Sequence, residues 1–107
     1  MACGYLASEG LLILERNFRC RSGEIDIIAK DKETYVFVEV KYRRSSSMGF
    51  PSEAVDRKKQ ATISKVADFY RVRYKLSSDT SYRFDVISIM GSEIKWYKNA
   101  FDYCGFC

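Results

Sequence analysis

Residues 34–42 constrain the fold most, because they have the strongest β-strand composition in the chain. They read Thr-Tyr-Val-Phe-Val-Glu-Val-Lys-Tyr, and β-branched and aromatic residues dominate them. Successive side chains alternate across a strand, so the valines are predicted to lie on one face. Phe37, Glu39 and Lys41 then share the other face, which places a carboxylate beside an ammonium group.

A second strand is predicted just upstream, over residues 24–29, where Glu24 and Asp26 share a face. A short polar turn separates the two strands, so they can pair in the antiparallel sense. Asp26, Glu39 and Lys41 would then converge on one spot. Two carboxylates close together suit a hard divalent cation such as Mg²⁺ or Mn²⁺. A lysine beside them can orient an attacking water or stabilise the transition state.

The rest of the pattern gives the order αβββαββ, which predicts an α/β fold with a mixed sheet and flanking helices. The chain has 107 residues and is expected to form one domain, residues 1–107. A long helix is predicted from an N-cap at Asp56 to about Tyr74, because its apolar residues recur at helical spacing. The other expected elements are a helix over residues 2–9, strands over 11–19, 82–90 and 93–98, a bend at Asn17, a loop over 45–49 and a helical turn from Pro51.

The charge distribution favours an anionic partner. There are 18 Lys and Arg residues against 14 Asp and Glu residues, a net charge of +4. Basic residues around an acidic centre suit a phosphodiester substrate, whose backbone needs neutralising. Ordinary solvated surface charge is the alternative reading of each cluster. The candidate nucleic-acid contacts are Arg43, Arg44, Arg57, Lys58 and Lys59.

Composition argues against several other classes of protein. No apolar run approaches the roughly 20 residues that a membrane span needs, and no secretory signal is recognisable, so a cytoplasmic location is expected. The 4 cysteines include Cys104 and Cys107 in a Cys-x-x-Cys arrangement, but Cys3 and Cys20 lack zinc-knuckle spacing and the chain has no histidine. Reduced thiols are therefore favoured over a structural zinc site.

Several short stretches of the sequence resemble the YraN family of uncharacterised bacterial endonuclease-like proteins, part of the PD-(D/E)xK nuclease superfamily. The stretches that carry the resemblance are residues 13–19, 23–29, 36–43, 51–55, 83–86 and 99–101. Together they span almost the whole chain. The resemblance implies a restriction-endonuclease-like fold, similar to that of archaeal Holliday junction resolvases, and a role in nucleic-acid processing.

The resemblance also implies roles for individual residues. Asp26 matches the superfamily's metal-binding aspartate, Glu39 its second acidic ligand, and Lys41 the lysine of its Glu-x-Lys element. Glu24 would be an accessory ligand, since it shares a face with Asp26. For Asp85, a structural ion pair is expected in preference to a role in the site.

Members of this family usually begin with a longer first helix, and related resolvases place a glutamate of that helix in the metal site. Here the glutamate would fall just before Met1, so the first helix is expected to be truncated. The cation would then depend on Asp26, Glu39 and Glu24 with waters. We therefore expect weak metal binding and poor cleavage or none.

Two functional hypotheses follow. The first is a metal-dependent endonuclease that hydrolyses phosphodiester bonds in DNA, with branched or junction DNA as a candidate substrate. The second is a nucleic-acid-binding or protein-binding module that has the nuclease fold without efficient chemistry. A homodimer is compatible with either hypothesis, because the aromatic residues near the C-terminus fit an interface as well as the last layer of a core. Those residues are Trp96, Tyr97, Phe101, Tyr103 and Phe106.

Overall fold

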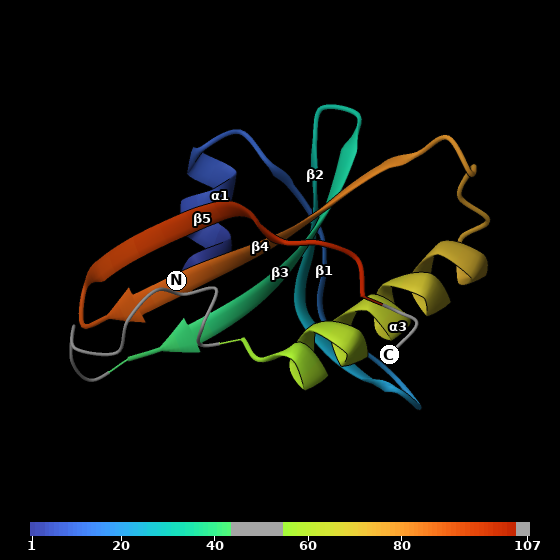
Figure 1. Cartoon of the computed structure of the whole chain (residues 1–107). Coiled ribbons are helices and arrows are strands. Elements are labelled where there is room, and N and C mark those ends of the chain that lie inside the picture. The colour runs from blue at the N-terminus through green and yellow to red at the C-terminus, as the bar shows by residue number, and fades with distance from the viewer. Residues whose placement is uncertain (44–54, 105–107) are drawn as a thin grey trace.

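The computed structural model describes residues 1–43 and 55–104, and its elements follow the predicted order αβββαββ (Figure 1). The helices are α1 (Ala2–Ser8) and α3 (Arg57–Arg73). The strands are β1 (Leu12–Cys20), β2 (Gly23–Asp31), β3 (Thr34–Tyr42), β4 (Ser81–Met90) and β5 (Glu93–Phe101).

The strands form one mixed sheet in the order β1-β2-β3-β4-β5. All neighbours are antiparallel except β3 and β4, which run parallel on either side of the α3 crossover. Antiparallel neighbours need only tight turns, whereas a parallel pair needs a long connection. The mixed α/β fold class predicted from the sequence is therefore confirmed.

Two hydrophobic cores lie on the two faces of the sheet. Helix α3 covers one face, where Ile63, Val66 and Tyr70 pack with Phe37 and Phe84. Helix α1 covers the other face, where Ala2 and Leu6 pack with side chains of β2, β3 and β4. In β3 the valines belong to the α1 face and Phe37 to the α3 face, as the alternation predicted. Glu39 and Lys41 therefore project on the α3 side.

Local backbone features explain where the strands bend and end. Asn17, where a bend was predicted, has a positive φ of 52° within β1, whereas the pairing of β1 with β2 shifts register earlier, between Ile13 and Glu15. Asn99 has a φ of 53°, and the pairing of β4 with β5 shifts register between Phe84 and Val86. An asparagine tolerates this conformation, so β5 passes through a bulge and continues beyond its predicted end at residue 98.

Two of the C-terminal aromatic residues, Trp96 and Phe101, pack against different cores. Trp96 packs against the α1 core and meets Tyr5 edge-on at 6.2 Å between ring centroids. Phe101 belongs to the α3 core and stacks on Phe84 at 5.1 Å. Both rings are therefore part of the last core layer.

Some sequence predictions lie outside the described residues. They are Arg44, the loop 45–49, the turn at Pro51, Phe106 and Cys107. Within the described ranges, no helix is long and apolar enough to cross a membrane.

Candidate metal and nucleic-acid site

The candidate site forms where β2 and β3 separate. Their pairing ends at Ile27 opposite Val38, and Asp26 and Glu39 occupy the next position on each strand. The side chain of Asp26 fills the gap, because the Val40 backbone N–H donates to Asp26 Oδ2 over 2.8 Å. A carboxylate thus replaces the backbone acceptor that a continuing ladder would supply. Asp26 Oδ1 accepts no hydrogen bond from the described residues.

Glu39 is a buried carboxylate, with only 5% of the residue exposed. Lys41 Nζ lies 3.2 Å from Glu39 Oε2, and Lys59 Nζ lies 3.8 Å from the same oxygen. Lys41 comes from the same strand, whereas Lys59 reaches across from the first turn of α3. The structure therefore brings together the predicted Glu39–Lys41 pair and adds a second ammonium group.

The charge of Asp26 affects the ionisation of Glu39. Burial raises the pKa of Glu39 above its ordinary value, and the negative charge of Asp26 raises the pKa further. The ammonium groups of Lys59 and Lys41 lower it in part. The two carboxylates thus repel each other, and positive charge at this spot stabilises both.

The start of α3 fixes the position of Lys59. Asp56 is the N-cap, as predicted, and its Oδ1 accepts a hydrogen bond from the Lys59 backbone N–H over 2.8 Å. The Gln60 side chain donates to the Val55 carbonyl over 2.8 Å, and Val55 is fully buried. The sequence placed Lys59 among general nucleic-acid contacts. Its location in the first turn after a cap was the available signal, but the orientation of α3 over β3 was not predictable.

Glu24 has a different partner. Its Oε2 lies 3.4 Å from Arg19 Nε on the neighbouring strand β1. Among residues 1–43 and 55–104, no three His, Cys, Asp or Glu side chains are grouped so that they could hold a metal ion. The structure thus brings together Asp26 and Glu39 as the candidate carboxylates and leaves Glu24 outside any larger group.

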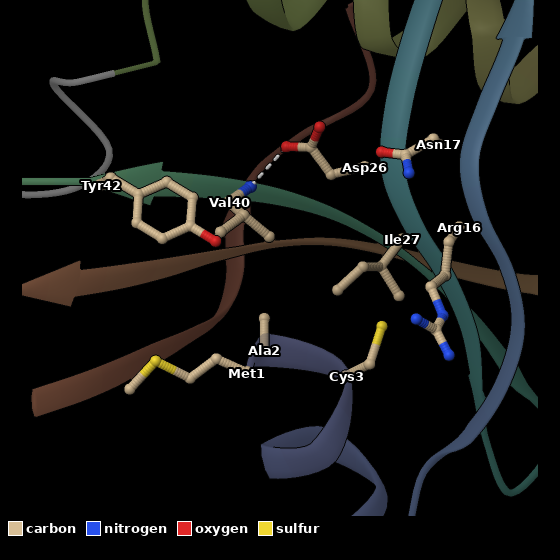
Figure 2. A pocket seen from close by; sticks show the side chains of 9 residues that line it. All are labelled: Met1, Ala2, Cys3, Arg16, Asn17, Asp26, Ile27, Val40 and Tyr42. Carbon is tan, nitrogen blue, oxygen red and sulfur yellow. Dashed lines mark hydrogen bonds between the residues drawn. The ribbon is translucent and has the colours of Figure 1, made fainter. Parts of the chain in front are cut away.

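An open pocket of about 240 Å³ lies on the α1 side of Asp26 (Figure 2). Its wall includes Arg16 and Asn17 from β1, Asp26 from β2 and Tyr42 from β3, and the first turn of α1 closes it. Glu39 does not line this pocket, because it projects toward α3. Asp26 therefore lies at the boundary between the pocket and the spot that Glu39 and the lysines occupy.

The predicted nucleic-acid contacts differ in their environments. Arg43 is half-buried, and one of its guanidinium nitrogens, Nη2, is buried without a hydrogen-bond partner in the described residues. Arg57 Nε donates to Cys104 Sγ over 3.1 Å, and Lys58 is exposed. Lys58, Lys59 and Arg57 all lie in the first turn of α3, whose N-terminal end itself favours anions.

Asp85 forms a buried ion pair with Arg83, as predicted. It is fully buried on β4, and its carboxylate accepts two hydrogen bonds from Arg83, at 2.9 and 3.0 Å. The Trp96 indole N–H donates over 2.8 Å and the Asn99 backbone N–H over 2.9 Å. Arg83 also bonds Asp31, over 3.1 Å. This network joins β4 to β5 and to the end of β2.

Comparison with known proteins gives consistent matches. The profile described as "Uncharacterised protein family UPF0102" matches residues 1–89. A UPF0102 protein of Lachnoclostridium phytofermentans is 47% identical over 104 residues, which cover 97% of this chain and 88% of the relative. A UPF0102 protein of Persephonella marina is 48% identical over a match that covers 94% of this chain and 86% of the relative. A UPF0102 protein of Caldicellulosiruptor bescii is 54% identical over a match that covers 83% of this chain and 75% of the relative.

Proposed function

This chain belongs to the uncharacterised protein family UPF0102, the YraN family that its motifs indicated, and we propose that it is a divalent-metal-dependent endonuclease acting on DNA. Branched or junction DNA is the candidate substrate. The observation that carries the proposal is the arrangement of Asp26, Glu39 and Lys41 where β2 and β3 separate. Family membership alone does not carry it, because the family is itself uncharacterised.

The chemistry of these donors fits Mg²⁺ or Mn²⁺. Asp26 and Glu39 offer carboxylate oxygens, and the charge of Asp26 already raises the pKa of its neighbour. A cation between them would relieve that repulsion. Mg²⁺ commonly takes one or two protein carboxylates together with waters and substrate phosphate oxygens, so two carboxylates suffice. When bound, the cation supplies Lewis-acid chemistry and makes water a better nucleophile at neutral pH.

The residues of the chain would have distinct roles. Asp26 and Glu39 would hold the cation, and the hydrogen bond from Val40 keeps the Asp26 carboxylate oriented. Lys41 stays beside Glu39, where its ammonium group positions a water or stabilises the charge that develops on the phosphate. Contacts to the DNA backbone come from the basic residues Arg43, Arg44, Arg57, Lys58 and Lys59.

A second candidate function is a nucleic-acid-binding or protein-binding module with little or no catalysis. It is favoured by one observation: two lysines neutralise Glu39, and the part of the chain that the structure describes holds no third carboxylate at the site. Such a module would bind DNA through its basic residues, but it would not hydrolyse it.

Cleavage and metal binding together test the proposal. Supercoiled plasmid and a four-way DNA junction are incubated with Mn²⁺ or Mg²⁺, with and without EDTA, and Asp26→Asn serves as the control. Cleavage that needs the cation and Asp26 is the expected result. Calorimetry should show Mn²⁺ binding that an Asp26→Asn, Glu39→Gln double variant loses. Equal heats from both proteins, or cleavage that survives in Asp26→Asn, would contradict the proposal.

A further inference from the structure

The carboxylate of Glu39 has more cationic partners than a simple ion pair needs. Lys41 and Lys59 both approach its Oε2 atom, at 3.2 and 3.8 Å. The charge of Glu39 is therefore compensated by two ammonium groups without a metal ion. A divalent cation on Glu39 would add two positive charges beside both ammonium groups, and one of them would have to withdraw.

Lys59 is the ammonium group that can withdraw. It is farther from the carboxylate than Lys41, and its side chain is 43% exposed against 33% for Lys41. Its backbone is fixed, because Asp56 caps α3 through the Lys59 N–H. The flexible four-carbon stem can therefore move without disturbing the helix.

We propose that Lys59 exchanges partners: it pairs with Glu39 in the metal-free protein and moves to a phosphate oxygen of the DNA when Glu39 takes a divalent cation. This inference rests on the proposed function, and it makes Lys59 a phosphate-contacting residue of the site. The position of Lys59 supports the exchange, since it lies in the first turn of α3 and the N-terminal end of a helix favours anions.

The exchange predicts that Lys59 contributes more to DNA binding when a cation is present than when it is absent. Fluorescence anisotropy is measured with a four-way DNA junction, once in EDTA and once in Ca²⁺. Lys59→Met keeps most of the stem and removes the charge. It should weaken the affinity only slightly in EDTA and by about five- to tenfold in Ca²⁺, where one charge-assisted phosphate contact is lost. Lys59→Arg should restore binding in Ca²⁺.

Lys58→Met is the matched control, because Lys58 is the exposed neighbour in the same turn and carries the same charge. It should weaken DNA binding by the same factor in EDTA and in Ca²⁺. A second readout needs no DNA. Calorimetry should show that Lys59→Met binds Mn²⁺ several-fold more tightly than the wild type, since the competing ammonium group is gone, whereas Lys58→Met binds it unchanged.

Several results would overturn the exchange. They are equal losses for Lys59→Met in EDTA and Ca²⁺, Mn²⁺ binding that is unchanged or weaker in Lys59→Met, and a wild type that binds neither cation. Failure of the nuclease function would look different. A wild type that cleaves no DNA, with the cation-dependent effect of Lys59→Met intact, refutes catalysis and supports the exchange. Cleavage without that effect refutes the exchange alone.

Discussion

Replacing Asp85 by asparagine should destabilise this protein strongly, whereas the matching change at Glu39 should not. Both residues are buried carboxylates on neighbouring strands, 0% and 5% exposed. Each oxygen of Asp85 accepts two hydrogen bonds: Oδ1 from Arg83 and the Asn99 backbone, Oδ2 from Arg83 and Trp96. In either orientation, an asparagine would turn its NH₂ group toward two of these donors.

The cost follows from what Asp85→Asn leaves behind. Removing one partner of a buried ion pair costs about 3–5 kcal/mol, because the other charge stays buried without compensation. Arg83 keeps its bond to Asp31 at 3.1 Å, so we expect the lower end, about 3 kcal/mol. In a domain of this size, each kcal/mol lowers Tm by about 4 °C or more, so Tm should fall by at least about 12 °C.

Glu39→Gln is the matched amide control. Burial and the charge of Asp26 raise the pKa of Glu39, so its ionised form is disfavoured in the folded protein. The folded state therefore holds a proton more tightly than the unfolded state. This contribution to stability is lost as pH rises from the ordinary value of 4.5 through the raised folded-state pKa. At neutral pH, Glu39→Gln should leave stability unchanged or increase it.

Urea unfolding at pH 7, followed by circular dichroism, measures both variants. Asp85→Asn should shift the midpoint to lower urea with an unchanged slope. A loss below about 1 kcal/mol, less than a single unsatisfied buried donor costs, would show that the network at Asp85 is not structural. Equal losses for the two variants would show that Glu39 is also a structural carboxylate, which would weaken its assignment to the site.

Three further predictions concern the site and the core. Lys41→Ala should preserve the fold and Mn²⁺ binding but slow single-turnover DNA cleavage; unchanged cleavage would place the activity elsewhere. Arg43→Ala should weaken binding to all duplexes alike and reduce the slope of log K against log salt by about one in anisotropy titrations, whereas a sequence-dependent loss would argue against a phosphate contact. Burial raises the pKa of Tyr70 to about 12 from 10.0, so stability should fall as pH rises between those values. Urea midpoints measured across this pH range should show that Tyr70→Phe lacks this pH-dependent loss of stability. An identical pH profile for the variant and the wild type would contradict the prediction.

Much of the fold was predictable because local patterns dominate it. The alternation around Glu39 gave the faces of β3, and the apolar stripe with its cap at Asp56 gave α3 nearly to the residue. The end of β5 was not predictable, since nothing in the sequence shows that Asn99 takes a positive φ and lets the strand continue.

The site was predictable only in part, for a related reason. Asp26, Glu39 and Lys41 lie on adjacent strands joined by a tight turn, so pairing alone brings them together. Lys59 depends on how α3 crosses the sheet, and the crossing angle depends on packing among many side chains. The bond from Val40 to Asp26 was also not predictable, because it requires the strands to separate at that position.

The parallel pairing of β3 with β4 has a consequence for the order of folding. The two strands run side by side from Thr34–Ser81 to Tyr42–Ile89, yet α3 and its connections separate them in the chain. The β1–β2–β3 meander and the β4–β5 hairpin need only tight turns, whereas joining them requires closure of a long loop. We therefore expect the joining of these two units to limit the folding rate. Asp26, Glu39 and Lys41 belong to the first unit and can come together before the two units join. Lys59 reaches Glu39 only once α3 has docked.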